Sequence, residues 1–157
     1  MNAVYSFLFI ALSLSSAVSA SECWPGWVRF EQSCYSFGRE NVSWPEAASL
    51  CRELGGYIVE IDTKAENDWV VSQITAKNFV MTWIGANDIL EEGTFRWLTS
   101  KTPVGTVPYW STGQPNNLEK GEHCVDIDKN FGYRWSDDEC NNAKPFVCEQ
   151  SGWCQSR

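Results

Sequence analysis

The sequence predicts one α+β domain, in which two helices pack against antiparallel sheets and disulfides tie the parts together. Two helix-start signals of the form Ser/Thr-x-x-Glu lie in the first half of the chain. Short apolar segments separated by Gly, Pro and Asn fill the second half, as in a series of strands. Seven cysteines accompany this pattern. Helices followed by strands are typical of an α+β fold.

Residues 1–20 carry no charged side chain, hold an apolar run over residues 7–12, and end in Val18-Ser19-Ala20. This pattern predicts a secretory signal peptide. The run is shorter than the roughly 20 residues that span a bilayer, so we expect no membrane insertion. The expected organisation is a signal peptide over 1–20, a domain over 21–150 and a short tail over 151–157. The protein should be extracellular, where thiols pair.

The first helix should begin at Ser43, because Ser43-Trp44-Pro45-Glu46 forms a capping box with proline in the first turn. Gly55-Gly56 should end it. Its apolar residues recur at helical spacing on one face: Trp44, Ala47, Ala48, Cys51 and Leu54. A second capping box, Thr63-x-x-Glu66, opens a weaker helical stripe that runs toward Asn78 and contains Trp69, Val70, Gln73 and Ile74.

Strands are predicted wherever short apolar segments stand between turn residues. They cover 34–37, 57–61, 80–86, 94–98, 123–127, 133–136 and 145–149. A long stretch rich in Gly, Pro and Asn separates Leu98 from Cys124. Loops of this length in compact domains are usually disordered or functional, and this one should be functional.

The loop and the strand after it offer oxygen ligands. Gln114-Pro115-Asn116, Glu122 and Trp135-Ser136-Asp137 follow one another along the chain, with Cys124 and Cys140 beside them. Ca²⁺ takes roughly six to eight oxygens from carboxylates, amides and water in irregular geometry. The segment therefore predicts a calcium-binding loop.

The residues quoted so far resemble the C-type lectin domain, and the resemblance covers essentially the whole chain after the signal segment. It is carried by landmarks in the family's order and spacing: Cys23, Cys34, Cys51, Trp83-Ile84-Gly85-Ala86, Gln114-Pro115-Asn116, Cys124, Trp135-Ser136-Asp137, Cys140 and Cys148. The resemblance implies the disulfides Cys23–Cys34, Cys51–Cys148 and Cys124–Cys140. Cys154 is then left over, as a capped thiol or as an interchain bond that gives a disulfide-linked homodimer, which the odd count favours.

The same resemblance implies that Gln114, Asn116, Glu122, Ser136 and Asp137 hold the calcium and contact the sugar, with Pro115 in the cis form. Of these ligands only Glu122 and Asp137 bring full charge, and Ser136 stands where an asparagine is usual. Weaker calcium binding than in a typical member is expected, because affinity follows ligand charge. An auxiliary, weaker calcium position would use Asp88, Glu92 and Asn117, with His123 as a solvated loop residue.

The family implies a function in binding neutral sugars on glycans or microbial surfaces, as in innate immune recognition. Glu-Pro-Asn resembles a triplet for mannose-type sugars and Gln-Pro-Asp one for galactose, so the hybrid at Gln114 to Asn116 belongs to neither. Leu118 stands where galactose binders often place an aromatic, which favours mannose, glucose or N-acetylglucosamine. The alternative is a lectin-like module that binds a protein, ice or a mineral.

Other functions are less well supported. A net charge of −8 without a basic stripe argues against nucleic acid as a partner. One histidine and no Gly-x-Ser-x-Gly motif argue against an enzyme. Asp138 and Glu139 are interpreted as a solvated strand end. The tryptophans at 83, 97, 110 and 135 are expected in the core, and Asn41-Val42-Ser43 is a glycosylation acceptor.

Overall fold

The computed structural model describes residues 23–105, 109–118 and 121–151. The predicted signal segment and Cys154 lie outside these residues. The elements are β1 (Val28–Phe30), β2 (Ser33–Val42), α1 (Trp44–Glu53), β3 (Tyr57–Ile58), α2 (Lys64–Ala76), β4 (Met81–Asn87), β5 (Arg96–Trp97), β6 (Glu122–Asp128), η2 (Lys129–Phe131), β7 (Arg134–Glu139) and β8 (Lys144–Ser151). Two helices and the predicted strands confirm the α+β class. Strand β1 was not predicted, and β3 ends at Ile58 instead of continuing to residue 61.

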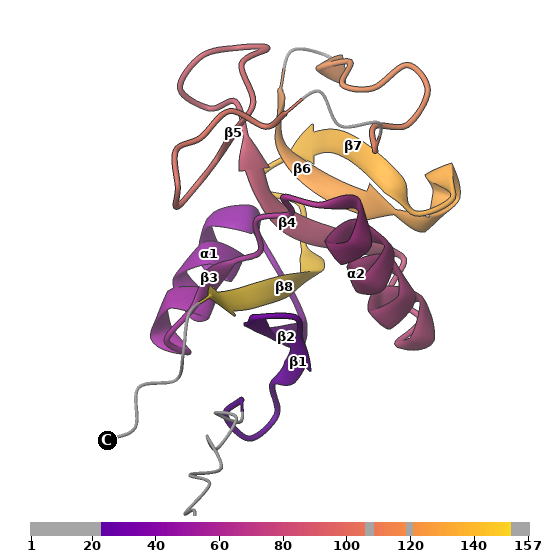
Figure 1. Ribbon diagram of the computed structural model, residues 1–157. Coiled ribbons are helices and arrows are strands. Elements are labelled where there is room, and N and C mark those ends of the chain that lie inside the picture. The colour runs from indigo at the N-terminus through magenta and orange to yellow at the C-terminus, as the bar shows by residue number, and fades with distance from the viewer. Residues whose placement is uncertain (1–22, 106–108, 119–120, 152–157) are drawn as a thin grey trace, which may run out of the picture.

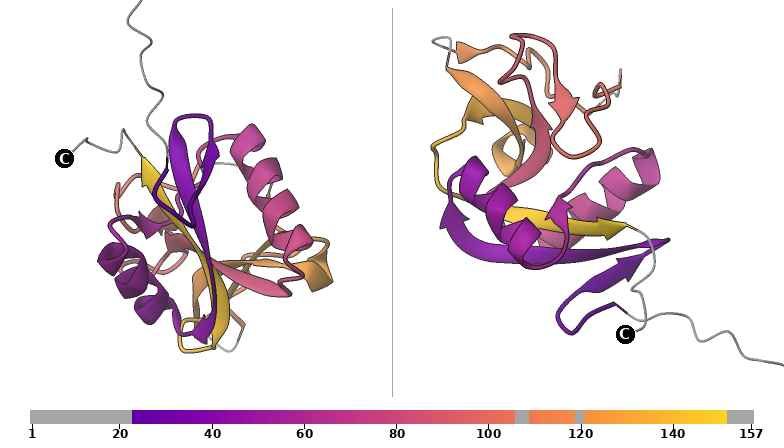
Figure 2. Two further views of the ribbon diagram at one scale, coloured as in Figure 1. Left: turned by 90° about the horizontal axis from the view of Figure 1, so that it is seen from below. Right: turned by 90° about the vertical axis from the view of Figure 1, so that its left-hand side faces the viewer.

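The strands form a sheet in the order β1-β2-β8-β4-β6-β7, with β3 paired to β8 and β5 to β4. Neighbours are antiparallel except β4 and β8, which touch in parallel at Trp83 and Phe146. Figure 1 shows the β6–β7 hairpin and the long loops at one end of the molecule, with β1, β2 and β8 at the other. Figure 2 shows α1 and α2 on opposite sides of the β2–β8 pair.

Helix α1 begins as the sequence predicts. The backbone N–H and the hydroxyl of Ser43 both donate to the Glu46 carboxylate, at 2.9 and 2.6 Å. These bonds, the hydroxyl first, lower the pKa of Glu46. The predicted apolar face is buried, except for Leu54, which is 45% exposed because the helix ends at Glu53 and Leu54 caps it.

Helix α2 forms only half of its predicted capping box. The Thr63 hydroxyl accepts from the Glu66 N–H at 3.1 Å. The Glu66 carboxylate does not return to Thr63. It accepts from the Asp62 N–H at 3.0 Å and from the Tyr35 hydroxyl at 2.8 Å. The reciprocal bond was therefore wrongly predicted, because Glu66 is used to join α2 to β2.

The core is rich in tryptophan, as predicted. Trp83 and Trp135 are fully buried and Trp97 is 3% exposed, while Trp110 is half-buried. The rings of Trp97, Tyr109 and Trp110 surround Trp135 at centroid distances of 5.8, 5.2 and 6.0 Å. The tryptophans therefore pack the interior beneath the long loops.

Three disulfides join distant parts of the described chain, and they are the pairs that the family resemblance implies: Cys23–Cys34, Cys51–Cys148 and Cys124–Cys140. The second joins α1 to β8. The third joins β6 to the residue that follows β7. The loop is therefore attached to a cross-linked hairpin.

Candidate functional site

The loop that carries Gln114, Pro115 and Asn116 is fixed over strand β7. On its N-terminal side, the Trp135 N–H donates to the Tyr109 carbonyl and the Ser111 N–H donates to the Trp135 carbonyl, each at 2.8 Å. On its C-terminal side, the chain enters β6, which pairs with β7. The Gln114–Pro115 peptide is cis, as the resemblance implies. The triplet is thus held beside Ser136 and Asp137.

Asp137 organises the loop. Its Oδ1 accepts from the Asn116 N–H at 3.0 Å, and its Oδ2 accepts from the Asn117 N–H at 2.7 Å. The residue is 3% exposed. Since a carboxylate has about four lone-pair directions, these two bonds leave acceptor capacity unused.

Glu122 closes the other side of the loop. Its Oε2 accepts from the Leu118 N–H at 2.8 Å, and its own N–H donates to Asn117 Oδ1 at 3.1 Å. The Asn117 side chain is therefore used within this loop. Burial raises the pKa of Glu122, and the charges of Asp137 and Asp138 raise it further. A cation between these carboxylates would relieve their repulsion.

Gln114 supplies the clearest sign of a ligand. Its Oε1 is buried and has no hydrogen-bond partner, a property that it shares, in the part of the chain that the structure describes, only with Thr82 Oγ1. An unpaired buried acceptor costs about 1–3 kcal/mol, so native structures usually satisfy it. Ca²⁺ binds amide oxygens, and Gln114 is one of the residues expected to hold it.

Ser136 lies beside Asp137, but its hydroxyl donates its hydrogen bond to a residue outside the loop. It donates to Asp126 Oδ1 at 2.6 Å, and both residues are buried. The serine oxygen keeps its lone pairs, so its role as a ligand stays a prediction.

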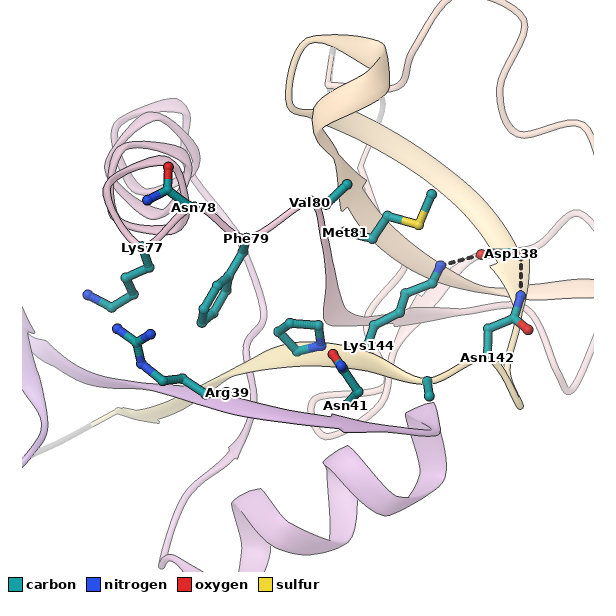
Figure 3. Close-up of a pocket in the computed structure, with 12 residues that line it drawn as sticks. Arg39, Asn41, Lys77, Asn78, Phe79, Val80, Met81, Asp138, Asn142 and Lys144 are labelled. Atoms are coloured by element: carbon teal, nitrogen blue, oxygen red, sulfur yellow. Dashed lines mark hydrogen bonds and ion pairs between the residues drawn. The ribbon is translucent and has the colours of Figure 1, made fainter.

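A buried lysine compensates the carboxylates below the loop. Lys144, 3% exposed, pairs with both Asp126 and Asp138, and its Nζ lies 3.9 Å from the centre of the Trp83 ring. Figure 3 shows Lys144 reaching Asp138, which also accepts from Asn142. The interpretation of Asp138 as solvated was wrong, because this aspartate belongs to an ion-pair network, while Glu139 is exposed.

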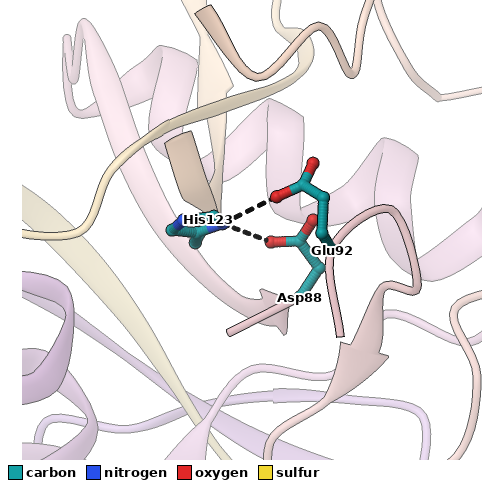
Figure 4. A group of neighbouring side chains, drawn as sticks. All are labelled: Asp88, Glu92 and His123. Carbon is teal, nitrogen blue, oxygen red and sulfur yellow. Dashed lines mark hydrogen bonds and ion pairs between the residues drawn. The ribbon is translucent and has the colours of Figure 1, made fainter. Parts of the chain in front are cut away.

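Asp88, Glu92 and His123 meet at the ends of β4 and β6. His123 Nδ1 lies 3.0 Å from Asp88 Oδ1 and 3.4 Å from Glu92 Oε2. Figure 4 shows the ring directed at both carboxylates. The description of His123 as a solvated loop residue is corrected, since it lies in β6 and contacts both predicted auxiliary ligands.

A second group of carboxylates was missed in the sequence. Glu60, Glu66 and Glu149 line a pocket of about 390 Å³ and are each less than a tenth exposed. Glu149 accepts from the Ser33 hydroxyl at 2.8 Å and from the Glu60 N–H at 3.3 Å. Burial, with a contribution from Glu66, raises the pKa of Glu149 to about 7. We call these three residues the acidic pocket.

Asn41 is exposed on the rim of another pocket, of about 710 Å³, between β2, the end of α2 and the start of β8 (Figure 3). Its glycosylation stays a prediction. Neither helix in the described ranges is long and apolar enough to cross a bilayer.

The model of the lectin C-type domain family matches residues 40–150. The chain belongs to the C-type lectin domain family. A perlucin-like protein of Mytilus galloprovincialis is 35% identical over 146 residues, which are 90% of this chain and 92% of that protein. The mouse low affinity immunoglobulin epsilon Fc receptor is 34% identical over 94% of this chain, which spans only 43% of that receptor.

Solved structures agree with this assignment. The carbohydrate-recognition domain of cow CD23, determined in the presence of a GlcNAc2Man3 oligosaccharide, has a TM-score of 0.76 and 30% identity, with 85% of this chain and 99% of that one covered. A calcium-independent type II antifreeze protein has a TM-score of 0.74 at 23% identity, covering 84% of this chain and 96% of that one, and shows the shared fold alone. The family model and the solved structures thus agree on a C-type lectin-like domain.

Proposed function

We propose that this protein is a secreted, calcium-dependent lectin for neutral sugars, with Ca²⁺ held by Gln114, Asn116, Glu122, Ser136 and Asp137. The buried Gln114 Oε1 without a partner carries the proposal. It belongs to a loop that Asp137 and Glu122 brace through backbone N–H groups. When bound, Ca²⁺ would ligate sugar hydroxyls directly. The same side chains would accept or donate hydrogen bonds to those hydroxyls.

The ligand chemistry favours mannose, glucose or N-acetylglucosamine over galactose. Amides both donate and accept, while Glu122 and Asp137 only accept, so the site suits a pair of adjacent hydroxyls. Leu118 is 63% exposed at the position where an aromatic would stack on galactose. The mannose-containing oligosaccharide of the cow CD23 structure supports the choice of probe.

Retention on sugar resins tests the proposal. The protein should bind mannose or N-acetylglucosamine resin in millimolar Ca²⁺ and elute with EDTA. Glu122→Gln should not be retained, whereas Glu139→Gln, a matched change at an exposed residue of the paired strand, should behave as wild type. Retention that ignores EDTA would reject the calcium mechanism.

A non-sugar partner is the second candidate. Ile89, Leu90 and Leu118 are 52, 88 and 63% exposed on the loops that border the site. Exposed apolar side chains of this kind suit a protein surface or an ordered solid better than a hydrated sugar. A lack of retention on every neutral sugar, with calcium binding intact, would favour this candidate.

We further propose that residues 1–20 are removed as a signal peptide, that 21–150 form the lectin domain, and that Cys154 in the tail 151–157 links two copies. Ser151, the first residue of that tail, is the last residue of β8. Recognition of microbial glycans is the biological function that fits a secreted lectin. Non-reducing electrophoresis of wild type and Cys154→Ser tests the dimer, and a wild-type monomer band would reject it.

A further inference from the structure

The predicted auxiliary calcium position at Asp88 and Glu92 also holds the imidazole nitrogen of His123. His123 Nδ1 faces Asp88 Oδ1 and Glu92 Oε2, and the three atoms all lie within 4.8 Å of one another. His123 is the single histidine of the sequence. The position therefore offers one imidazole and two carboxylates.

These donors fit calcium poorly. Ca²⁺ takes roughly six to eight oxygen ligands, and an imidazole nitrogen is not among those it prefers. Zn²⁺ and its neighbours in the first transition row bind imidazole nitrogen and carboxylate oxygen at about 2.0–2.2 Å. Three protein ligands and one water complete a tetrahedral zinc site. We propose that Asp88, Glu92 and His123 bind a divalent transition ion of the Zn²⁺ type instead of a second calcium.

The site is already partly ordered by its surroundings. Asp88 is 2% exposed, and its Oδ2 accepts from the Gly93 N–H at 2.7 Å, so Oδ1 is left directed at His123. The Asp88 N–H donates to the His123 carbonyl at 3.1 Å, which fixes the separation of the two backbones. Hydrogen bonds of this kind orient metal ligands and strengthen binding.

Glu92 and His123 make the site accessible to an ion from solvent. The side chain of Glu92 is 56% exposed and that of His123 is 34% exposed, so an ion can reach both from solvent. Figure 4 shows Glu92 approaching the histidine from the loop and Asp88 from the end of β4.

The inference does not depend on sugar binding. Zinc binding at Asp88, Glu92 and His123 and calcium binding at the Gln114 loop are measured separately. Failure of one leaves the other unaffected.

Isothermal titration calorimetry, with Zn²⁺ added to the full-length chain, tests the proposal. The protein carries Cys154→Ser, because a thiolate is itself a zinc ligand, and the buffer holds millimolar Ca²⁺ to saturate oxygen-only sites. We expect one Zn²⁺ per chain. His123→Gln should weaken zinc binding by at least about tenfold, since even changes to groups behind the ligands cost that much.

Two neighbouring glutamates supply a matched control. Glu92→Gln should weaken Zn²⁺ binding, whereas Glu91→Gln, which alters the adjacent exposed residue, should leave it unchanged. His123→Asp should lose Zn²⁺ and bind an additional Ca²⁺. Equal zinc affinity in wild type and His123→Gln would overturn the proposal and leave a histidine that only contacts the two carboxylates. Displacement of Zn²⁺ by the millimolar Ca²⁺ would overturn it in favour of a calcium site.

Discussion

The proposed calcium loop and the acidic pocket both contain several carboxylates, but different groups satisfy these carboxylates in the two places. In the acidic pocket, Glu60 accepts from the N–H groups of Thr99 and Ser100, and hydroxyl groups reach Glu66 and Glu149. In the loop, backbone N–H groups donate to the carboxylates of Asp137 and Glu122, while the side-chain oxygen of Gln114 has no hydrogen-bond partner. The acids of the pocket are thus stabilised by hydrogen-bond donors and a proton, whereas the loop keeps a buried oxygen that a bound cation would satisfy.

The largest stability effect is expected below the loop, at Lys144. Lys144→Met would leave Asp126 buried without its cation, and breaking such a pair costs about 3–5 kcal/mol. Lys77→Met, at a lysine whose contact is the Phe37 ring at 4.6 Å, should cost less than about 1 kcal/mol. Urea unfolding of both variants measures the difference. Similar costs would show that the network below the loop is not needed for stability.

The acidic pocket should be sensitive to pH. The pKa of Glu149 is about 7 in the folded protein and 4.5 for the unperturbed group, so folding takes up a proton between these values. The contribution of Glu149 to the free energy of unfolding should therefore be largest below pH 4.5. It should fall as the pH rises to about 7, by at most about 3 kcal/mol. Glu149→Gln should flatten this slope.

The control for the pH experiment is Glu53→Gln, which changes an exposed glutamate at the end of α1 and should keep the wild-type slope. Burial also raises the pKa of Glu66. The Glu149→Gln variant should therefore keep a part of the pH dependence of stability. An unchanged slope would mean that Glu149 stays charged in the folded protein.

In the loop, the proposed Ca²⁺ would take the place of the proton as the stabilising partner. A ligand that binds only the native state adds about 2.7 kcal/mol at a hundred times its Kd. Glu122→Gln and Asp137→Asn should each lose the calcium-induced rise in melting temperature, whereas Glu139→Gln should keep it. If both loop variants retain the rise, the ion lies elsewhere, at the acidic pocket or beside Asp88.

The smallest effect is expected from substitutions in the triplet Gln114-Pro115-Asn116. Gln114→Glu and Asn116→Asp each add a carboxylate, so both should tighten calcium. Their acceptors lie at opposite ends of the triplet, so the first should favour mannose and the second galactose. Competition on a glycan array checks this. If the two variants share the parent's selectivity, the shape of the loop determines the sugar.

Much of the fold could be predicted because its signals are local. The Ser43 capping box and the alternation of apolar residues with turns depend on neighbours in sequence. The three disulfides and the cis peptide at Pro115 came instead from the family resemblance. The half-formed capping box at Thr63 shows the limit, since Tyr35 lies far away in sequence and takes the Glu66 carboxylate.

The site was predicted as a set of ligands but not as a network. Lys144 was not singled out in the sequence, because the predicted strand began at residue 145. Its alternation with Phe146 and Cys148 nevertheless places it on a buried face of β8. Asp126 and Asp138 come close to it only once β8, β4, β6 and β7 lie side by side in the sheet. Similarly, the contact of His123 with Asp88 and Glu92 becomes visible only when β4 and β6 lie side by side.

The calcium loop and the two ends of the described chain lie at opposite ends of the molecule (Figure 1). Ser151 is therefore far from the loop. If the proposed Cys154 bond links two copies, we expect the binding loop of each copy to stay accessible. Such a pair would bridge separate particles, and clumping of sugar-coated beads that stops after reduction would be its signature.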